Sequence, residues 1–227
     1  MKRLVATVAS LVVFAATVAR AATVIAIDID STRTGGSTTT GGSVFTTAGW
    51  TSLDVTTPDT ANGASVVVEG ITFSIASADS SRVRLTAGLT NPNDLTADFA
   101  YDDGANQAVI LLFGSAGASL PAGQWQAEVW AWDAGVASFE TNVMSIGWRQ
   151  NGVETIPAPS AVPDPVNPAA TFTFTSDGTS AYDVFVRENS AGDRARINAV
   201  RLTQVPEPAA ASLLALCLGA LAARRRR

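Results

Sequence analysis

The middle of the chain alternates apolar and polar residues in short runs, the pattern of β-strands that lay one face on a core. In residues 23–30, three isoleucines fall on one face, while Asp28 and Asp30 fall on the other. Further strands are predicted at 44–45, 50–55, 66–75, 82–85, 95–101, 107–113, 124–133, 143–149, 171–175, 181–187 and 196–202. Within 66–75, Glu69-Gly70 indicates either a hairpin or a bulged strand.

Turn residues separate these runs. Residues 120–123 read Leu-Pro-Ala-Gly, a tight-turn sequence, and Asn151-Gly152 and Ser176-Asp177-Gly178 mark two more turns. Residues 155–168 contain five prolines, which predicts a long surface connection, and the Thr/Gly/Ser stretch 31–43 is too polar to pack. About ten to twelve strands with closely spaced turns and no helical stretch between the two ends predict an all-β protein with a single β-sandwich domain over residues 22–204.

Two features of the predicted domain indicate which kind of β-sandwich it forms. The Leu-Pro-Ala-Gly turn precedes an aromatic strand, and the closing strand 196–202 reads Arg-Ile-Asn-Ala-Val-Arg-Leu. This combination resembles the galactose-binding-like jelly rolls over about half of the body. The resemblance implies a jelly-roll-like sandwich, and it adds carbohydrate binding to the functions to be weighed.

The strand 124–133 is the most regular in the chain. Its odd positions are all apolar and are predicted to face the core, while its even positions begin polar and end in Trp130 and Trp132. Two exposed indole rings one strand repeat apart would form a platform on which sugar rings stack. The alternative, which we favour because large aromatic side chains are mostly buried, is that a loop such as the proline-rich one covers both rings.

The N-terminus has the three regions of a secretory signal peptide. Met1-Lys2-Arg3 is basic, residues 4–18 are apolar, and Ala19-Arg20-Ala21 matches the A-x-A cleavage sequence. Residues 1–21 are therefore predicted to be removed by signal peptidase, and the following domain is predicted to be exported.

The C-terminus has a different three-part order. Val205 and the sequence Pro206, Glu207, Pro208 come first, an apolar run follows at 209–223, and four arginines end the chain, Arg224, Arg225, Arg226 and Arg227. The run predicts a membrane helix stopped by cytoplasmic arginines. Its fifteen residues span about 22 Å as a helix, against a hydrocarbon core of about 30 Å. It is therefore better suited to temporary than to permanent anchoring, and the prolines hold an extended, accessible segment before it.

This order resembles the PEP-CTERM sorting signal of bacterial surface proteins, over residues 205–227. The resemblance implies that an exosortase, an integral membrane cysteine protease-transferase, reads the Pro-Glu-Pro sequence and removes the tail. It also implies a protein of the cell envelope, surface or extracellular matrix that is transiently anchored in the inner membrane. It concerns delivery, and leaves open what the delivered domain binds.

Charge and composition exclude several classes of function. Without the two terminal segments, eight of the fifteen basic and nineteen of the twenty acidic residues remain, so the domain carries about −11 against −5 for the whole chain. Such a charge opposes nucleic-acid binding. The chain has no histidine, and its one cysteine, Cys217, lies in the tail. These counts exclude histidine-based triads and dyads, and disulfides within the exported domain.

Carboxylates are the remaining candidates for chemistry. Asp28 and Asp30 share a strand face, and Asp102-Asp103 begins an oxygen-rich turn, so either pair is a candidate for Ca²⁺. The alternatives are that the strand acids face solvent and that the turn is an Asx turn. A glycosidase pair among Asp102, Asp103, Glu128, Asp133 and Glu140 is a weaker hypothesis, because nineteen acids supply pairs by chance.

The favoured interpretation is an exported, non-enzymatic protein with a structural or adhesive role at the cell surface or in the exopolysaccharide matrix. The first alternative is a carbohydrate-binding module of jelly-roll type, which would bind extracellular polysaccharide. The second is a secreted enzyme that acts on polysaccharides. The implied processing partners are signal peptidase and exosortase.

Overall fold

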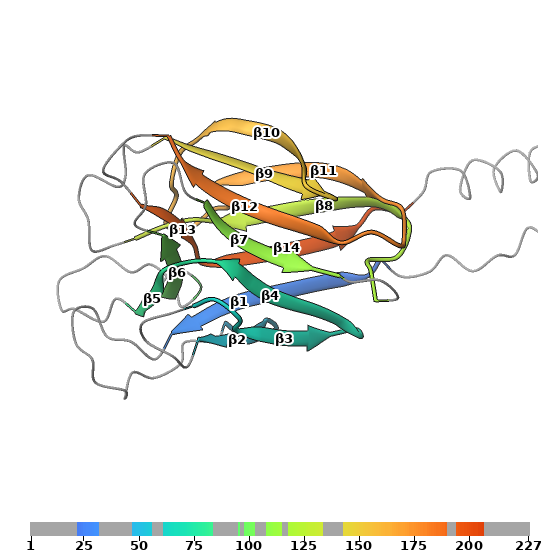
Figure 1. Cartoon of the computed structure of the whole chain (residues 1–227), viewed down its shortest axis with the longest axis horizontal. Helices are drawn as coiled ribbons and strands as arrows, with labels where there is room; N and C mark the ends of the chain where they lie inside the picture. The colour runs from blue at the N-terminus through green and yellow to red at the C-terminus, as the bar shows by residue number, and fades with distance from the viewer. Residues whose placement is uncertain are drawn as a thin grey trace, which may run out of the picture. The chain divides into compact units, whose positions relative to one another are not determined.

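The computed structural model describes residues 22–31, 47–55, 61–83, 95, 98–102, 108–114, 118–133, 143–189 and 194–206. Within these residues the regular elements are fourteen β-strands arranged in three sheets (Figure 1). The prediction of an all-β protein is confirmed for this part of the chain. The predicted signal peptide and the predicted membrane helix lie outside the described residues.

The first sheet has five strands, and the last strand of the chain lies at its centre. β1 and β2 pair in parallel, and the other neighbours are antiparallel. In spatial order the strands are β11 (Ala170–Ser176), β8 (Gly123–Trp130), β14 (Ala199–Gln204), β1 (Val24–Ser31) and β2 (Thr51–Val55).

The second sheet has six antiparallel strands, two pairs of which are hairpins. Glu69 and Gly70 have φ of 53° and 77°, and Asn151 and Gly152 have φ of 50° and 80°, so both turns have the left-handed residues of a type I′ hairpin. The open choice at 66–75 is thus decided in favour of a hairpin. The order is β10 (Val153–Ala161), β9 (Met144–Gln150), β12 (Tyr182–Glu188), β7 (Ala108–Phe113), β4 (Ile71–Ser77) and β3 (Ser65–Val68).

These two sheets face each other across one hydrophobic core. Phe174 of β11 marks the contact, since its ring lies 5.6 Å from Trp148, 6.5 Å from Phe113 and 5.6 Å from Tyr182, which belong to three strands of the second sheet. The odd positions of β8 are buried as predicted, and Trp125 among them donates its indole N–H to the carbonyl oxygen of Pro121 at 2.9 Å. The predicted turn at 120–123 therefore also fixes a core side chain.

A third, small sheet lies beyond the C-terminal end of β1, at the left in Figure 1. Its strands in order are β13 (Ala195–Ile197), β6 (Asp98–Asp102) and β5 (Ser80–Val83). It is tied to β1 by the Ser31 N–H, which donates to Asp98 Oδ2 at 3.0 Å, and by the Ser31 hydroxyl, 2.8 Å from that of Ser81. The sequence did not predict this separate sheet.

Three predicted boundaries are wrong. The closing strand 196–202 is broken at Asn198, and its two halves belong to different sheets. The strand 124–133 ends at Trp130. The connection at 155–168 is a strand up to Ala161, because β10 is an edge strand, where Pro157 and Pro159 interrupt no ladder on its outer side.

The backbone of the bulged edge strand β10 also approaches that of its neighbour β9 closely. Its pairing with β9 shifts register between Thr155 and Ala158 and again before Ala161. At Gly147 of β9, an added Cβ would collide with the Thr155 carbonyl oxygen and lie 3.1 Å from the Phe185 ring. Glycine is therefore required there for close approach of the two backbones rather than for a turn.

Candidate functional site

The last strand of the domain leads without a linker into the predicted sorting sequence. Gln204 is the last residue of β14 and pairs with Trp125 of β8. Val205 follows half-buried and Pro206 is exposed, as an accessible segment requires. Glu207, Pro208 and the rest of the tail lie outside the described residues.

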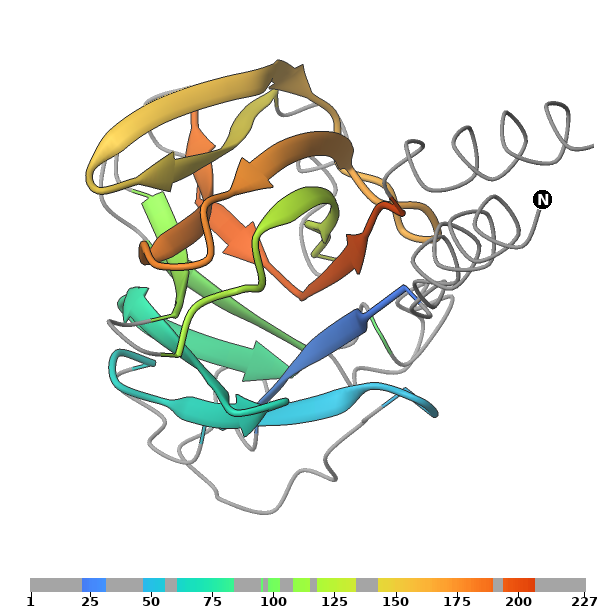
Figure 2. The same cartoon turned by 90° about the vertical axis from the view of Figure 1, so that its right-hand side faces the viewer.

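The first strand begins beside the end of the last one. Val24, the first residue of β1, pairs with Thr203 of β14, and Figure 2 shows the start of β1 next to the end of β14. Val24 is 53% exposed. The two predicted processing segments, 1–21 and 205–227, therefore join the domain at neighbouring positions of one sheet.

The comparison with known families decides the identity of the tail. Residues 204–227 match the family model described as the PEP-CTERM protein-sorting motif. The tail is a PEP-CTERM sorting signal. The motif implies an exported protein that is transiently anchored in a membrane and processed by an exosortase, as predicted. No curated protein and no solved structure matches the chain.

The match covers the tail and β14's last residue, so it does not describe the function of the β domain. In the described part of the chain, no helix is long and apolar enough to cross a membrane. The segment 209–223 that is predicted to cross lies outside that part.

Trp130 and Trp132 are both in the interior, each with 5% of its surface exposed, which is the buried alternative. Neither ring offers a face to a sugar in this structure. The residues that cover Trp130 are not those of the proline-rich loop, which was named as one example of a covering loop. The cover comes from Trp50, whose ring packs edge-on at 5.1 Å, and from Leu95.

The outer face of the five-stranded sheet begins next to Trp130. Arg201 lies with its guanidinium carbon 5.5 Å from the Trp130 ring centre and donates from Nε and Nη2 to the Glu128 carboxylate at 2.5 and 2.7 Å. This bidentate hydrogen bond raises the pKa of Arg201. The Glu128 carboxylate is thus held by a fixed positive charge.

The acids of β1 do not face solvent. Asp28 and Asp30 are 0% and 1% exposed, although they lie opposite the isoleucine face. At this end of β1 a second layer covers the outer face, because the small sheet packs against β1 and the Thr47 N–H donates to Asp28 Oδ2 at 2.8 Å. The alternative that these acids face solvent is therefore wrong, since the alternation of a strand does not show what covers its second face.

The calcium hypothesis gains no support from the described residues. Among them, no three carboxylate, histidine or cysteine side chains come together as a metal ion would require. Asp102 is buried at the end of β6, and Asp103 lies outside the described part of the chain. A Ca²⁺ site at Asp102-Asp103 thus stays a prediction, which thermal midpoints with excess Ca²⁺ and with a chelator would test.

The described members of the suggested glycosidase set have structural partners. Asp133 Oδ2 accepts a hydrogen bond from Arg196 Nε at 2.9 Å, and the two side chains are 0% and 2% exposed. Glu128 is held by Arg201, and Asp102 is buried. Glu140 and Asp103 lie outside the described residues.

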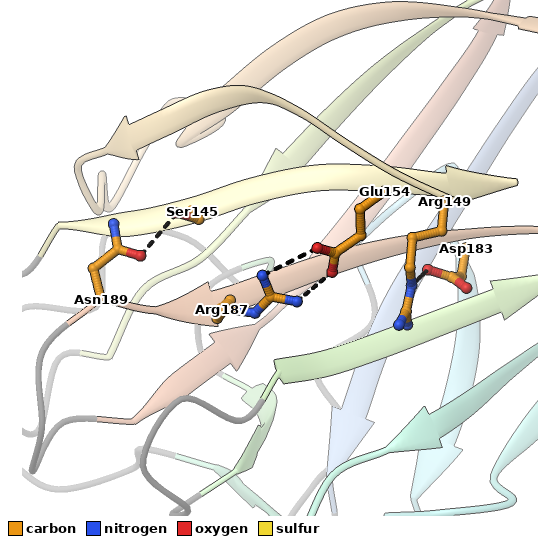
Figure 3. Close-up of polar contacts among 6 residues, drawn as sticks. All are labelled: Ser145, Arg149, Glu154, Asp183, Arg187 and Asn189. Carbon is orange, nitrogen blue, oxygen red and sulfur yellow. Dashed lines mark hydrogen bonds and ion pairs between the residues drawn. The ribbon is translucent and has the colours of Figure 1, made fainter. Parts of the chain in front are cut away.

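Charged residues also pair across the outer face of β9, β10 and β12 (Figure 3). Arg149 Nε contacts Asp183 Oδ1 at 2.7 Å, and Arg187 pairs with Glu154. Both guanidinium carbons lie over the buried Phe185 ring, at 5.5 and 5.0 Å. Partial burial raises the pKa of Asp183 in spite of Arg149.

Sequence reasoning missed Asn198, which joins the five-stranded sheet to the small one. Its Nδ2 donates to the Asp98 carbonyl oxygen, and its Oδ1 accepts from the Trp132 N–H, both at 2.6 Å. Its backbone N–H donates to the Trp130 carbonyl, and its own carbonyl accepts from the Ile29 N–H. The one available signal was a polar residue inside the apolar run of the closing strand.

Proposed function

We propose that this protein is a non-enzymatic component of the cell surface or extracellular matrix with a structural or adhesive role, delivered and processed through its PEP-CTERM tail. The sorting motif at 204–227 carries the proposal, because such a tail directs an exported protein through a membrane-bound processing enzyme. Two larger sheets around one core suit the jelly-roll-like sandwich that the sequence predicts for a surface domain.

The described carboxylates support a non-enzymatic role. A catalytic carboxylate must contact the substrate, whereas a carboxylate that already accepts hydrogen bonds from an arginine of its own domain has those oxygens engaged. Glu128 and Asp133 each bind an arginine through a charge-assisted hydrogen bond. Both side chains thus serve the stability of the domain, as part of the sheet's outer face and of a buried ion pair.

Processing is tested at Glu207, the one charge of the Pro-Glu-Pro sequence. In Glu207→Ala, the tail should be retained, or uncut protein should escape into the medium, because the enzyme loses the charge that it pairs with. The C-terminal mass of protein from the envelope and from the medium measures this. Glu154→Ala, which removes an exposed carboxylate of the domain, is the matched control and should be processed normally. A wild-type chain still ending at Arg227 would refute the sorting step.

The structural role is tested in cells that lack the gene. Loss of cell–cell cohesion or of matrix integrity is expected, with recovery by the wild-type gene and not by Glu207→Ala. Hydrolysis of extracellular polysaccharide should be equal in all three strains. Unchanged cohesion together with altered hydrolysis would favour the enzymatic alternative.

Glycan binding is the second candidate, favoured by the outer face of the five-stranded sheet. Thr173 of β11, Gln126 of β8 and Thr203 of β14 lie side by side in register and offer neutral hydroxyl and amide groups. Trp50 stands half-buried on Trp130 near the other end of this face. On an affinity gel containing extracted exopolysaccharide, Gln126→Ala should reduce retention if this face binds glycan. Equal retention with and without polysaccharide would remove the candidate.

A further inference from the structure

Gln204 is part of both the five-stranded sheet and the matched sorting motif. It is the last residue of β14, and it is the first residue that matches the sorting motif. A protease engages an extended backbone, whereas a residue in a sheet has its backbone engaged by a neighbouring strand. The match to the sorting motif thus begins at a residue that the sheet still pairs, three residues before Glu207.

The sheet holds the end of β14 unevenly. Thr203 pairs with Val24 of β1 on one side and with Gln126 of β8 on the other, whereas Gln204 pairs only with Trp125 of β8. Thr203 and Gln204 are both half-buried, so little apolar surface is exposed when they leave. The preceding residue, Leu202, is 1% exposed within the core.

The reach of the tail depends on these two residues. From Gln204 to Glu207 the chain spans three residues, at most about 11 Å when extended. From Leu202 it spans five residues, at most about 18 Å. The turn at 120–123 also lies close to this strand end, since Gln204 Nε2 donates to the carbonyl oxygen of Ala122 at 3.4 Å. A folded domain held within about 11 Å of Glu207 leaves few extended residues between the sheet and the sequence that a processing enzyme must engage.

We propose that Thr203 and Gln204 leave the sheet before the tail is processed, and that β14 opens no further than Leu202. The domain then stays folded while the enzyme receives a longer extended segment. The inference rests on the proposed processing by exosortase and adds the conformational step that controls it. The stability of the strand end thereby sets the rate of processing, because only the open population is a substrate.

A disulfide across the strand end tests the step in the full chain, in a Cys217→Ala background. Thr203→Cys with Gln126→Cys links directly opposed positions of β14 and β8, whose Cα separation in a ladder suits a disulfide. The matched control is Thr173→Cys with Gln126→Cys, which links β11 to β8 and leaves β14 free. A second version of each chain carries Gly-Ser-Gly-Ser between Gln204 and Val205, about 11 Å of flexible chain.

Pulse-chase with C-terminal mass analysis gives the processing rate. The oxidised Thr203→Cys/Gln126→Cys chain should be processed at least about tenfold more slowly than the control pair, and reductant or the spacer should restore the rate. Processing of the locked, unspaced chain at the control rate would overturn the proposal, and so would slow processing that the spacer does not relieve. Failure of the wild-type chain to be processed at all would instead refute the proposed sorting function.

Discussion

Replacing Asn198 by alanine should destabilise the domain more than any single surface substitution. Asn198 is 0% exposed, and its side chain makes two hydrogen bonds of 2.6 Å, to the Asp98 carbonyl and from the Trp132 N–H. The substitution removes both and leaves a backbone acceptor and a backbone donor without this partner. The alanine side chain cannot replace them, because it has no polar atom.

The magnitude follows from these two groups. A buried backbone group that loses its partner costs about 1–3 kcal/mol, so loss of the partner by two such groups should lower the free energy of unfolding by about 2–6 kcal/mol. Domains are stable by about 5–15 kcal/mol, so a large share is lost. In a domain of this size, about 2–4 °C of thermal midpoint accompanies each kcal/mol, which gives a fall of roughly 4–24 °C.

Urea unfolding of the processed protein, followed by tryptophan fluorescence, measures the change as a shift in midpoint at constant slope. Asn189→Ala is the matched control. Asn189 also makes two side-chain hydrogen bonds, from Ser145 Oγ at 2.8 Å and to the Pro159 carbonyl at 3.0 Å, but it is exposed, so water replaces them (Figure 3). Its substitution should cost at most about 1 kcal/mol. Equal costs at the two positions would refute the reasoning from burial.

Three further outcomes are expected. Arg196→Met should lower the free energy of unfolding in urea by about 3–5 kcal/mol, because it leaves the buried Asp133 without that arginine. Adding Asp133→Leu should recover most of this stability. A double variant as unstable as the single one would contradict the prediction. Hydrogen bonds that the Ser180 hydroxyl and N–H donate to Asp177 hold the pKa of Asp177 well below 3.8. Asp177→Asn should therefore lower the thermal midpoint at pH 7, and the difference from the wild type should shrink as the pH falls from about 4 towards 2. A difference that stays constant over this pH range would contradict the prediction. Reductant should leave the thermal midpoint unchanged, since Cys217 is the one cysteine; a shift would reveal an intermolecular disulfide.

The alternation of apolar and polar residues predicted strands well where only one face of the strand packs on the core. The odd positions of β8 and the isoleucines of β1 are buried as the alternation required. Prediction failed where a second layer covers the other face, as for Asp28, because the periodicity of a strand says nothing about its cover. It failed again at Asn198, where a single residue turns the chain from one sheet into another through long-range hydrogen bonds.

The candidate site divides in the same way. The sorting motif is a local sequence pattern, so residues 205–227 were predicted closely and the family match begins one residue earlier. Burial of Trp130 was favoured from the general burial of aromatic side chains, but its partners Trp50 and Leu95 are far away in sequence, so no local pattern identified them. The overlap of Gln204 with β14 required the register of the sheet, which no local pattern specifies.

The register also shows how charge is distributed along the domain. Six acidic residues that are at most 3% exposed lie towards the end where β1 finishes: Asp28, Asp30, Asp98, Asp102, Asp133 and Glu188. Acids also occur at the opposite end, where β14 finishes: exposed Asp177 lies between β11 and β12, and exposed Glu69 lies in the β3–β4 hairpin, whose strand β4 pairs through Phe73 with the last residue of β7. Exposed charges interact mainly within a Debye length of about 8–10 Å. The charge that a membrane-bound enzyme would meet is therefore set by exposed residues such as these rather than by the six buried acids at the far end.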